Sequence, residues 1–309
     1  MTGVTVRVPA KLNLQLAVGP PRADGFHDLV TVFHAVSLFD EITAEPAGRD
    51  RVTVRGEGAD RVPADQDNLA LRAVVALRAA VPSAPGVHIT IAKRIPVAAG
   101  LAGGSGDAAA ALVACNELWN GRLGQPKLLE IAARVGSDVA FALLGGTAVG
   151  RGRGERLTPA LAPATQHHWV LAFADGYLST PEVYAALDRQ RARAGGRGVQ
   201  VPAQPELDAA LMSALRSGDA RLVGRALSND LQPAALSLFP ALRKTLAAGL
   251  ELGALGALVA GSGPTCVFLA ASADRALDLA ASLSGAGVCR SVARASGPVP
   301  GAAIVSPAR

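Results

Sequence analysis

The sequence is poor in cysteine and in aromatic side chains. Among its 309 residues, 4% are aromatic and three are cysteines, Cys115, Cys266 and Cys289. The cysteines share no metal-ligand spacing and each lies in an apolar run, which argues against a zinc module and against a disulfide framework. We expect them to be small buried residues of a protein kept in a reducing cytoplasm. With so few rings, the core must be built mainly from alanine, valine and leucine.

Long apolar runs and clustered positive charge are missing as well. No stretch of about 18 uncharged apolar residues occurs, and the N-terminus alternates like a strand, unlike a signal peptide. The net charge is +5, but the basic residues form no stripe interleaved with aromatics. We therefore expect no membrane span and no nucleic-acid partner. The mild positive charge favours anionic small molecules as partners.

A glycine- and alanine-rich loop is the most informative segment of the chain. It covers residues 96–107 and is followed by an alanine-rich stretch, 108–118, that predicts a helix. Glycines allow several backbone N–H groups to point at one place, and a helix that starts there adds free N–H groups and a partial positive charge. The segment therefore predicts a phosphate site. Its candidate ATP-binding residues are Pro96, Val97, Ala98, Ala99, Gly100, Leu101, Ala102, Gly103, Gly104, Ser105 and Gly106.

Two common phosphate loops fit this segment poorly. A Walker A loop ends in Gly-Lys-Ser/Thr, whereas Asp107 follows Gly106 here. The dinucleotide fingerprint, placed on residues 104–109, should leave a strand directly, but the strand expected at 87–93 ends well before it and Pro96 intervenes. A flexible turn before a buried helix is the structural alternative to a phosphate site.

Strands and helices follow one another without a strict βαβ rhythm, which predicts an α+β fold. Strands are expected at residues 4–8, ending at Pro9, and at 10–18, 28–39, 41–44, 52–55, 87–93, 147–150, 168–174, 257–260, 265–269 and 288–293. Helices are expected at 69–80, 108–118, 126–136, 137–144, 181–193, 205–217, 220–227, 240–252 and 273–283. The Pro/Ala-rich segment 158–165 is the expected linker between two domains, 1–157 and 166–296. The last dozen residues are expected to be unstructured.

The glycine loop carries the pattern P-x-A-x-G-L-x-G-G-S-x-D-A-A, which resembles the phosphate loop of the GHMP kinase superfamily. Residues 261–266, Gly-Ser-Gly-Pro-Thr-Cys, resemble its third motif or form a tight turn between strands. The resemblance implies an N-terminal α+β domain followed by a ferredoxin-like C-terminal domain. It also implies ATP and Mg²⁺ as cofactors, with unknown metal ligands.

Two positions depart from the pattern of that superfamily. Ala102 replaces a glycine, which implies a backbone conformation that tolerates a Cβ atom. Gly106 replaces a serine, which removes a hydroxyl that could face the phosphates or Mg²⁺.

Two ionisable residues are the candidate catalytic groups. Lys11 lies in Pro-Ala-Lys-Leu-Asn-Leu, residues 9–14, on the strand face opposite Leu12 and Leu14. This segment resembles the motif P-A-K-[IVL]-N-L of the superfamily members in the non-mevalonate isoprenoid route, whose lysine lies beside the attacked hydroxyl. A solvated edge-strand lysine is the alternative. Asp138, in Gly-Ser-Asp-Val-Ala-Phe, resembles their catalytic aspartate, a general base, or else caps the helix that starts there.

Further residues resemble the cytidyl-substrate pocket of the same members. Asp-Gly-Phe-His at residues 24–27 matches D-G-[YF]-H, which assigns Phe26 to stack on the cytosine ring and His27 to hydrogen-bond its edge. Tyr184 resembles the second aromatic of that sandwich, and Asn13 and Thr180 are further candidate substrate-binding residues. Thr180 is also a natural N-cap, and a lone histidine more often has a structural role.

Together the motifs cover most of the chain and predict an ATP-dependent small-molecule kinase. The resemblance implies phosphorylation of the 2-hydroxyl of 4-diphosphocytidyl-2-C-methyl-D-erythritol by a monomer or a homodimer. It places Asn68 near the adenine of ATP, although Asn68 is equally a helix N-cap. The alternatives are another GHMP kinase such as homoserine kinase, a non-catalytic nucleotide-binding protein, and a dehydrogenase. A pure binder would need neither Lys11 nor Asp138, and a dehydrogenase would bind NAD.

Overall fold

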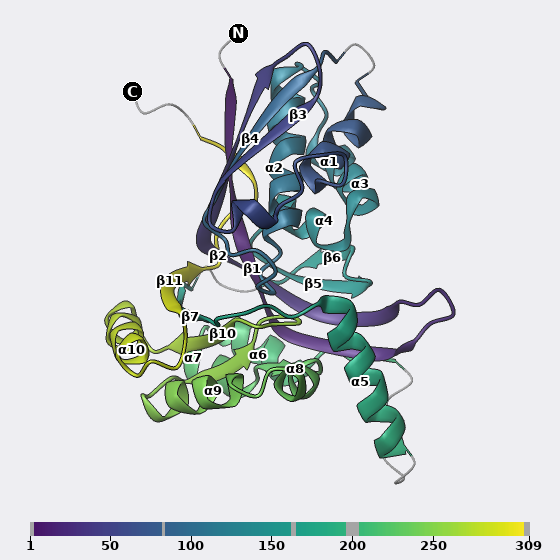
Figure 1. The fold of residues 1–309 in the computed structure, drawn as a ribbon. Coiled ribbons are helices and arrows are strands. Elements are labelled where there is room, and N and C mark those ends of the chain that lie inside the picture. Colours follow the sequence, from purple (N-terminus) through teal and green to yellow (C-terminus); the bar gives the residue numbers. More distant parts are fainter. Residues whose placement is uncertain (1–2, 82–83, 162–164, 196–203, 306–309) are drawn as a thin grey trace.

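The computed structural model describes residues 3–81, 84–161, 165–195 and 204–305, which form two β-sheets with helices packed on them (Figure 1). The first sheet is organised around a long antiparallel hairpin of β1 (Val4–Pro21) and β2 (His27–Pro46). Its other main strands are β3 (Arg51–Gly56), β4 (Val87–Lys93), β5 (Thr147–Gly152) and β6 (Arg156–Pro159). The two ends of β2 have different partners: residues 41–46 pair with β4, and residues 29–34 pair with β5. The hairpin therefore extends from one half of the molecule into the other.

The prediction that a strand ends at Pro9 is wrong. Strand β1 continues through Pro9, and its pairing with β2 shifts register between Pro9 and Ala10. Such an irregularity is where a strand can accommodate a proline, which has no N–H to donate to the ladder.

Four helices lie on one side of the first sheet (Figure 1). They are α1 (Leu69–Arg78), α2 (Gly103–Leu118), α3 (Gln125–Val135) and α4 (Ser137–Leu144). Helix α2 is central, and its residues Ala108, Ala109, Ala110 and Ala111 are fully buried. Small side chains let the neighbouring helix α1 and the sheet approach α2 closely, which accounts for a core with few rings. Helix α2 begins five residues earlier than predicted, inside the glycine loop.

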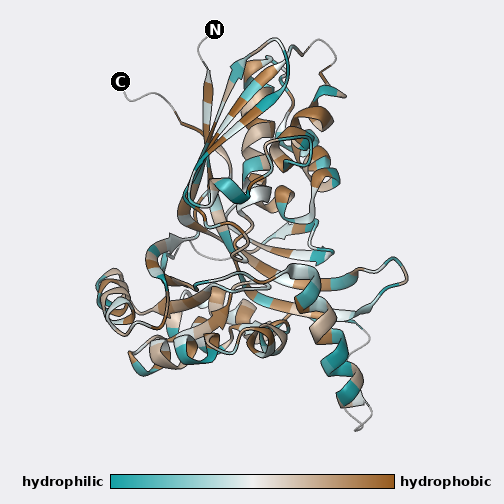
Figure 2. Ribbon diagram, in the orientation of Figure 1, coloured by the Kyte–Doolittle hydropathy of each residue, from teal (hydrophilic) through white to brown (hydrophobic). Residues whose placement is uncertain are grey.

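The second sheet is antiparallel, in the order β11 (Ser291–Gly297), β7 (His167–Phe173), β10 (Cys266–Ala270) and β9 (Gly256–Val259). Its helices are α5 (Thr180–Gly195), α6 (Ala209–Ser217), α7 (Ala220–Arg225), α8 (Gln232–Leu238), α9 (Leu242–Glu251) and α10 (Ala273–Gly285). Both faces of this sheet are buried, because Val170 packs toward α5, α9 and α10 whereas Leu171 packs against Leu12 and Leu14 of β1. Apolar residues line the strands and the helix sides that face them, while the far half of α5 is largely hydrophilic (Figure 2).

The mixed architecture confirms the predicted α+β class. The domain boundaries at 1–157 and 166–296 stay a prediction. The segment predicted as a linker begins inside β6, and residues 162–164 of it lie outside the described residues. Helix α6 starts later than predicted because Asp208 caps it, accepting hydrogen bonds from the amides of Ala210 and Leu211.

Several elements were missed by the sequence prediction. Helix α8 and the short strand β8 (Ser228–Asn229), which pairs with β1, were not expected. The C-terminal segment was expected to be unstructured, but β12 (Ala303–Ile304) pairs with Val6 and Arg7 of β1. Residues 306–309 lie outside the described residues. The strands β8 and β12 come from long-range pairing with β1, which a local sequence pattern does not encode.

The predicted burial of the cysteines is largely confirmed. Cys115 and Cys266 are buried and Cys289 is half-buried. Burial raises the pKa of the Cys115 and Cys266 thiols to about 12, so both stay in the unreactive thiol form at neutral pH. Among the helices that the structure describes, none combines the length and the apolarity needed to cross a bilayer.

A histidine is buried where the two sheets meet. His34 of β2 is fully buried, and its ring centroid lies 5.8 Å from those of His167 and Trp169 on β7. Its Nδ1 atom lies 2.9 Å from the Thr147 hydroxyl. Burial, with a contribution from His167, lowers the pKa of His34 to about 3. His34 is therefore neutral in the folded protein over the whole physiological range.

We predict that His34 makes the fold acid-sensitive. The unfolded chain protonates His34 near pH 6.5 whereas the folded chain does not, so stability is lost as the pH falls from about 6.5 toward 3. Replacing His34→Asn, which keeps a polar group near Thr147, should reduce the loss between pH 7 and pH 4.5 by about 2 kcal/mol. Urea unfolding at the two pH values measures it. Equal pH dependence in the two proteins would contradict the assignment.

Candidate active site

A cavity of about 510 Å³ lies between the glycine loop, the middle of β1, the first turns of α5 and the loop at Gly261 and Ser262. The starts of four helices border it, through Leu69 of α1, Gly103 of α2, Asp138 of α4 and Thr180 of α5. The first turn of a helix presents unpaired N–H groups and a partial positive charge. Four such turns around one cavity favour an anionic ligand.

Most of the predicted ATP-binding residues line this cavity. Those that do are Asn68, Pro96, Val97, Ala98, Ala99, Gly100, Ala102, Gly103, Gly104 and Ser105. Leu101 and Gly106 do not, because Leu101 is buried in the apolar core and a Cβ atom on Gly106 would point at Val8 of β1. The expected loss of a phosphate-facing hydroxyl at position 106 stays a prediction.

The backbone of the loop departs from the expectation for Ala102. Ala102 has a φ of 57° and Ala98 a φ of 54°, both in the left-handed region. A Cβ atom in this region costs roughly 1–2 kcal/mol per residue. Ala102 thus occupies a conformation that suits glycine, and the sequence inference that its backbone readily tolerates a Cβ atom is wrong.

The predicted third motif, residues 261–266, lies against the glycine loop. A Cβ atom on Gly100 would lie 2.0 Å from the carbonyl oxygen of Ala260, and Gly100 has a φ of 78°. A Cβ atom on Gly261 would lie 3.4 Å from both Lys11 Nζ and Asn13 Oδ1. The hydroxyls of Ser262 and Thr180 are 2.8 Å apart. The two loops and β1 therefore meet at one edge of the cavity.

Lys11 and Asp138 face each other across the cavity floor. Lys11 Nζ donates to Asn13 Oδ1 at 2.7 Å and lies 3.6 Å from Asp138 Oδ2. Leu12 and Leu14 are buried on the opposite face of β1, so strand alternation directs Lys11 and Asn13 into the cavity. The lysine is therefore no solvated edge residue.

Asp138 does not serve as the helix cap. The N-cap of α4 is Gly136, which has no side chain, and Asp138 lies within the first turn. Its carboxylate is about one-third exposed, with 30% of the side-chain surface accessible. The carboxylate is therefore free to face Lys11 and a ligand.

Of the aromatic residues predicted to bind the substrate, one lines the cavity and two lie at its border. Tyr184 lines the cavity, whereas Phe26 and His27 do not. His27 is buried, its ring 5.0 Å from that of Tyr184 and its Nε2 atom 3.0 Å from Asp188 Oδ1. Phe26 is 52% exposed and lies 5.1 Å from the guanidinium of Arg153, a cavity residue that sequence reasoning missed.

The Tyr184 hydroxyl is affected by the charge of Asp138, the candidate base. Burial raises the pKa of the Tyr184 hydroxyl, and the negative charge of Asp138 raises it further. The phenol stays protonated and can donate a hydrogen bond at any physiological pH.

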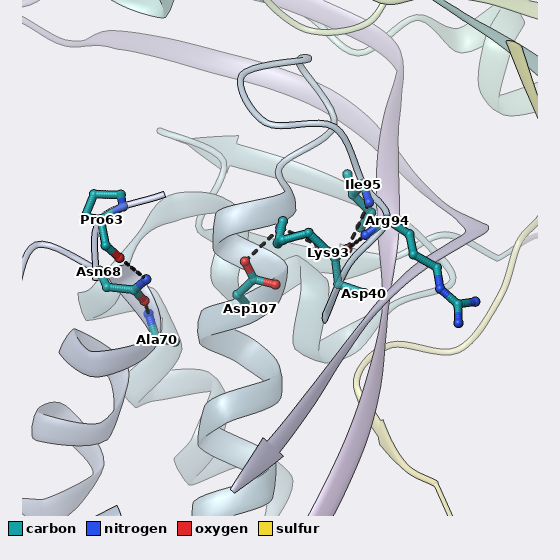
Figure 3. Close-up of polar contacts among 8 residues, drawn as sticks. All are labelled: Asp40, Pro63, Asn68, Ala70, Lys93, Arg94, Ile95 and Asp107. Carbon is teal, nitrogen blue, oxygen red and sulfur yellow. Dashed lines mark hydrogen bonds and ion pairs between the residues drawn. The ribbon is translucent and has the colours of Figure 1, made fainter. Parts of the chain in front are cut away.

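The predicted N-cap role of Asn68 is confirmed. Its Oδ1 atom accepts from the amide of Ala70 at 2.9 Å, and its Nδ2 atom donates to the carbonyl of Pro63 at 2.7 Å (Figure 3). The side chain thus joins the segment before α1 to the helix and shapes this wall of the cavity.

Beneath the glycine loop lies a buried charged cluster that sequence reasoning missed. Lys93 Nζ donates to Asp40 Oδ2 at 2.5 Å and to Asp107 Oδ2 at 2.8 Å, and all three side chains are at most 2% exposed (Figure 3). A signal was available, because the alternation along β4 puts Lys93 on the buried side with Ile89 and Ile91. A lysine there needs a carboxylate partner.

Comparison with known proteins gives consistent matches along the chain. The family model for the N-terminal domain of GHMP kinases matches residues 68–146, and the model for the C-terminal domain matches residues 211–289. A 4-diphosphocytidyl-2-C-methyl-D-erythritol kinase of Thermobifida fusca is 57% identical, over 98% of this chain and 99% of its own. A protein of the same name from Mycolicibacterium smegmatis is also 57% identical, over 98% of this chain and 92% of its own.

Solved structures agree with these matches. A crystal structure of 4-(cytidine 5'-diphospho)-2C-methyl-D-erythritol kinase has a TM-score of 0.75 and 34% identity, over 94% of this chain and 98% of its own. A homoserine kinase from Cytophaga hutchinsonii has a TM-score of 0.74 at 20% identity, over 99% of this chain and 98% of its own. At that identity the second match shows a shared fold alone.

We predict that the contact between the two loops requires glycine at position 100. In Gly100→Ala the new Cβ atom would collide with the carbonyl of Ala260 and would sit at positive φ, so the free energy of unfolding should fall by about 2 kcal/mol. Gly104→Ala is the matched control, because its Cβ atom meets only Leu69 at an ordinary 3.6 Å. It should leave stability unchanged or raise it by about 0.5 kcal/mol. Urea unfolding compares the two, and equal effects would contradict this account.

Proposed function

The chain belongs to the GHMP kinase family, and we propose that it transfers the γ-phosphoryl group of ATP to the 2-hydroxyl of 4-diphosphocytidyl-2-C-methyl-D-erythritol. The observation that carries this proposal is the pairing of Lys11 with Asp138 inside a cavity bounded by a phosphate loop. Phosphoryl transfer requires a phosphate seat, a cation near the reacting groups and a residue that orients the attacking hydroxyl. The cavity supplies a candidate for each.

The phosphate seat is the loop at residues 96–105 together with the first turn of α2. Helix α2 has 16 residues, and its N-terminal N–H groups and partial positive charge favour the ATP phosphates at that end. Asn68 fixes the start of α1 beside the nucleotide.

The oxygen donors at the cavity suit a Mg²⁺ ion that arrives bound to the nucleotide. Among the described residues, no group of three or more His, Cys, Asp or Glu side chains could form a resident cage. Mg²⁺ typically keeps several waters and binds through substrate phosphates with one or two carboxylates. The partly exposed Asp138 is a carboxylate of this chain that faces the same cavity. When bound, Mg²⁺ would neutralise charge on the transferring phosphoryl group.

Asp138 is the proposed general base for the attacked hydroxyl. Its carboxylate is accessible to a ligand, and it is held near Lys11 by strand β1 on one side and helix α4 on the other. The ammonium group of Lys11, 3.6 Å from this carboxylate, can stabilise the negative charge that develops on the hydroxyl oxygen. Asn13 holds Lys11 in place through the 2.7 Å hydrogen bond.

The cytidyl part of the substrate is proposed to bind at the Tyr184 side of the cavity. Tyr184 and Phe26 offer aromatic faces for stacking, and His27 and Thr180 offer polar groups. Asp188 orients the ring of His27 by contacting its Nε2 atom. Arg153 contacts Phe26 and lines the cavity, where its charge suits a diphosphate.

We predict that Asp138→Asn lowers kcat by a factor of 10² to 10⁴ while MgATP still binds, because the change removes a proton acceptor without changing shape. The matched control is Asp274→Asn, since Asp274 also lies in the first turn of a helix, α10, and does not line the cavity. Steady-state ADP release and MgATP titration measure the two effects. An unchanged kcat in Asp138→Asn would refute the assignment.

We predict that Phe26→Ala raises the KM for the cytidyl substrate about tenfold and leaves the KM for ATP unchanged, because one stacking face is lost. Tyr177→Ala is a suitable control: Tyr177 is 66% exposed and contacts Arg61 at 5.8 Å, as Phe26 contacts Arg153. It should leave both constants unchanged. A loss confined to kcat in Phe26→Ala would count against a role in binding.

A further inference from the structure

The cluster of Asp40, Lys93 and Asp107 joins the two ends of the phosphate loop. Lys93 is the last residue of β4, just before the loop, and Asp107 lies in the first turns of α2, just after it. Asp40, on β2, also accepts hydrogen bonds through its Oδ1 atom from the amides of Arg94 and Ile95, at 2.6 and 2.9 Å. One ammonium group therefore ties the entry of the loop, its exit and the sheet below.

The cluster lies directly against the residues proposed to receive the phosphates. A Cβ atom on Gly103 would lie only 2.9 Å from Lys93 Nζ. Lys93, Gly103 and Asp107 line the same cavity. A change of charge in the cluster therefore acts on the phosphate seat at short range and with little screening by water.

The cluster contains two carboxylates and one ammonium group. With both acids ionised it carries a net charge of −1, buried beneath a site for an anion. Asp107 Oδ1 has no hydrogen-bond partner among the described residues. Burial raises the pKa of Asp107 to about 7, Lys93 opposes this shift, and the charge of Asp40 adds to it. One proton on Asp107 makes the cluster neutral.

Other charges around the cavity do not account for this behaviour. Those that face it from β1, α4 and the neighbouring loops belong to Lys11, Asp138, Arg61, Asp67 and Arg153. None of them is among the groups that shift the pKa of Asp107. Burial would lower the pKa of Lys93, but Asp107 and Asp40 outweigh it and raise that pKa, so Lys93 stays charged.

We propose that Asp107 is a positioning residue for the ATP phosphates, and that its proton controls the strength of nucleotide binding. This inference rests on the proposed function, because it takes the loop as the seat of ATP. When Asp107 is protonated, the cluster beneath the loop is neutral and the helix N-terminus attracts the phosphates unopposed. When Asp107 is ionised, the added negative charge repels them. Binding of MgATP therefore draws a proton onto Asp107.

The test is the pH dependence of MgATP affinity, measured by titration calorimetry on the whole protein without acceptor. For the unaltered protein, the Kd should rise about three- to tenfold between pH 6 and pH 8.5. Asparagine is a neutral isostere of the protonated acid. The Kd of Asp107→Asn for MgATP should therefore change less than twofold between pH 6 and pH 8.5, and at pH 8.5 this variant should bind MgATP more tightly than the unaltered protein does.

Asp50→Asn is the matched control. Asp50 forms a two-point ion pair with Arg78, away from the cavity, so its loss costs stability without touching the phosphate seat. This variant should keep the pH dependence of the unaltered protein. A flat profile in Asp50→Asn would mean that any lost ion pair has this effect, and would overturn the inference.

The outcomes separate this inference from the proposed function. Binding of MgATP with parallel pH profiles in the unaltered protein and Asp107→Asn overturns the role of Asp107 and leaves the kinase assignment intact. Absence of MgATP binding at every pH refutes the proposed function, and the inference with it. If Asp107→Asn fails to fold, calorimetry of the unaltered protein at pH 8 in two buffers of different ionisation enthalpy decides. Net proton uptake on binding supports the inference, and zero uptake overturns it.

Discussion

Strand β1 belongs to both halves of the molecule, and the site depends on that. Its first part packs Val6 and Val8 under the helices of the first sheet, and its second part packs Leu12 and Leu14 against the second sheet. Because side chains alternate along a strand, Lys11 points to the opposite face of β1, into the cavity. The position of the Lys11 ammonium group, the proposed catalytic cation, is thus set by the burial of its apolar neighbours on β1. The same strand also determines how the two sheets pack together.

The cavity combines backbone N–H groups at helix starts with a few basic side chains. The chain has only four lysines, and two of them, Lys11 and Lys93, lie at the cavity and are paired with carboxylates. Arg61 and Arg153, which also line the cavity, and the helix starts around it supply the remaining positive potential. A phosphate site formed by helix starts is rigid, and its affinity for phosphate is sensitive to any buried charge beneath it.

The sequence predicted the class of fold and most elements, because period-two alternation and helix caps are local signals. Strand β4 and the cap at Asn68 follow directly from such signals. The strand through Pro9 and the pairing of β12 with β1 could not be predicted, because each depends on partners far away in the chain. The burial of Lys93 could have been predicted from the alternation along β4, but its partner Asp40, 53 residues away, could not. The sequence motif identified Asp138 as a candidate catalytic residue. Only the fold explains why its carboxylate does not cap the helix, because Gly136 occupies the N-cap position of α4.

The proposed reaction is transfer of the γ-phosphoryl group of ATP to the 2-hydroxyl of 4-diphosphocytidyl-2-C-methyl-D-erythritol. The most direct test offers MgATP to the purified protein with 4-diphosphocytidyl-2-C-methyl-D-erythritol, homoserine or mevalonate in parallel reactions and measures ADP release. ADP release is expected with the cytidyl compound alone, and the product should carry the new phosphate on its 2-hydroxyl. Release with homoserine or mevalonate but not with the cytidyl compound would contradict it.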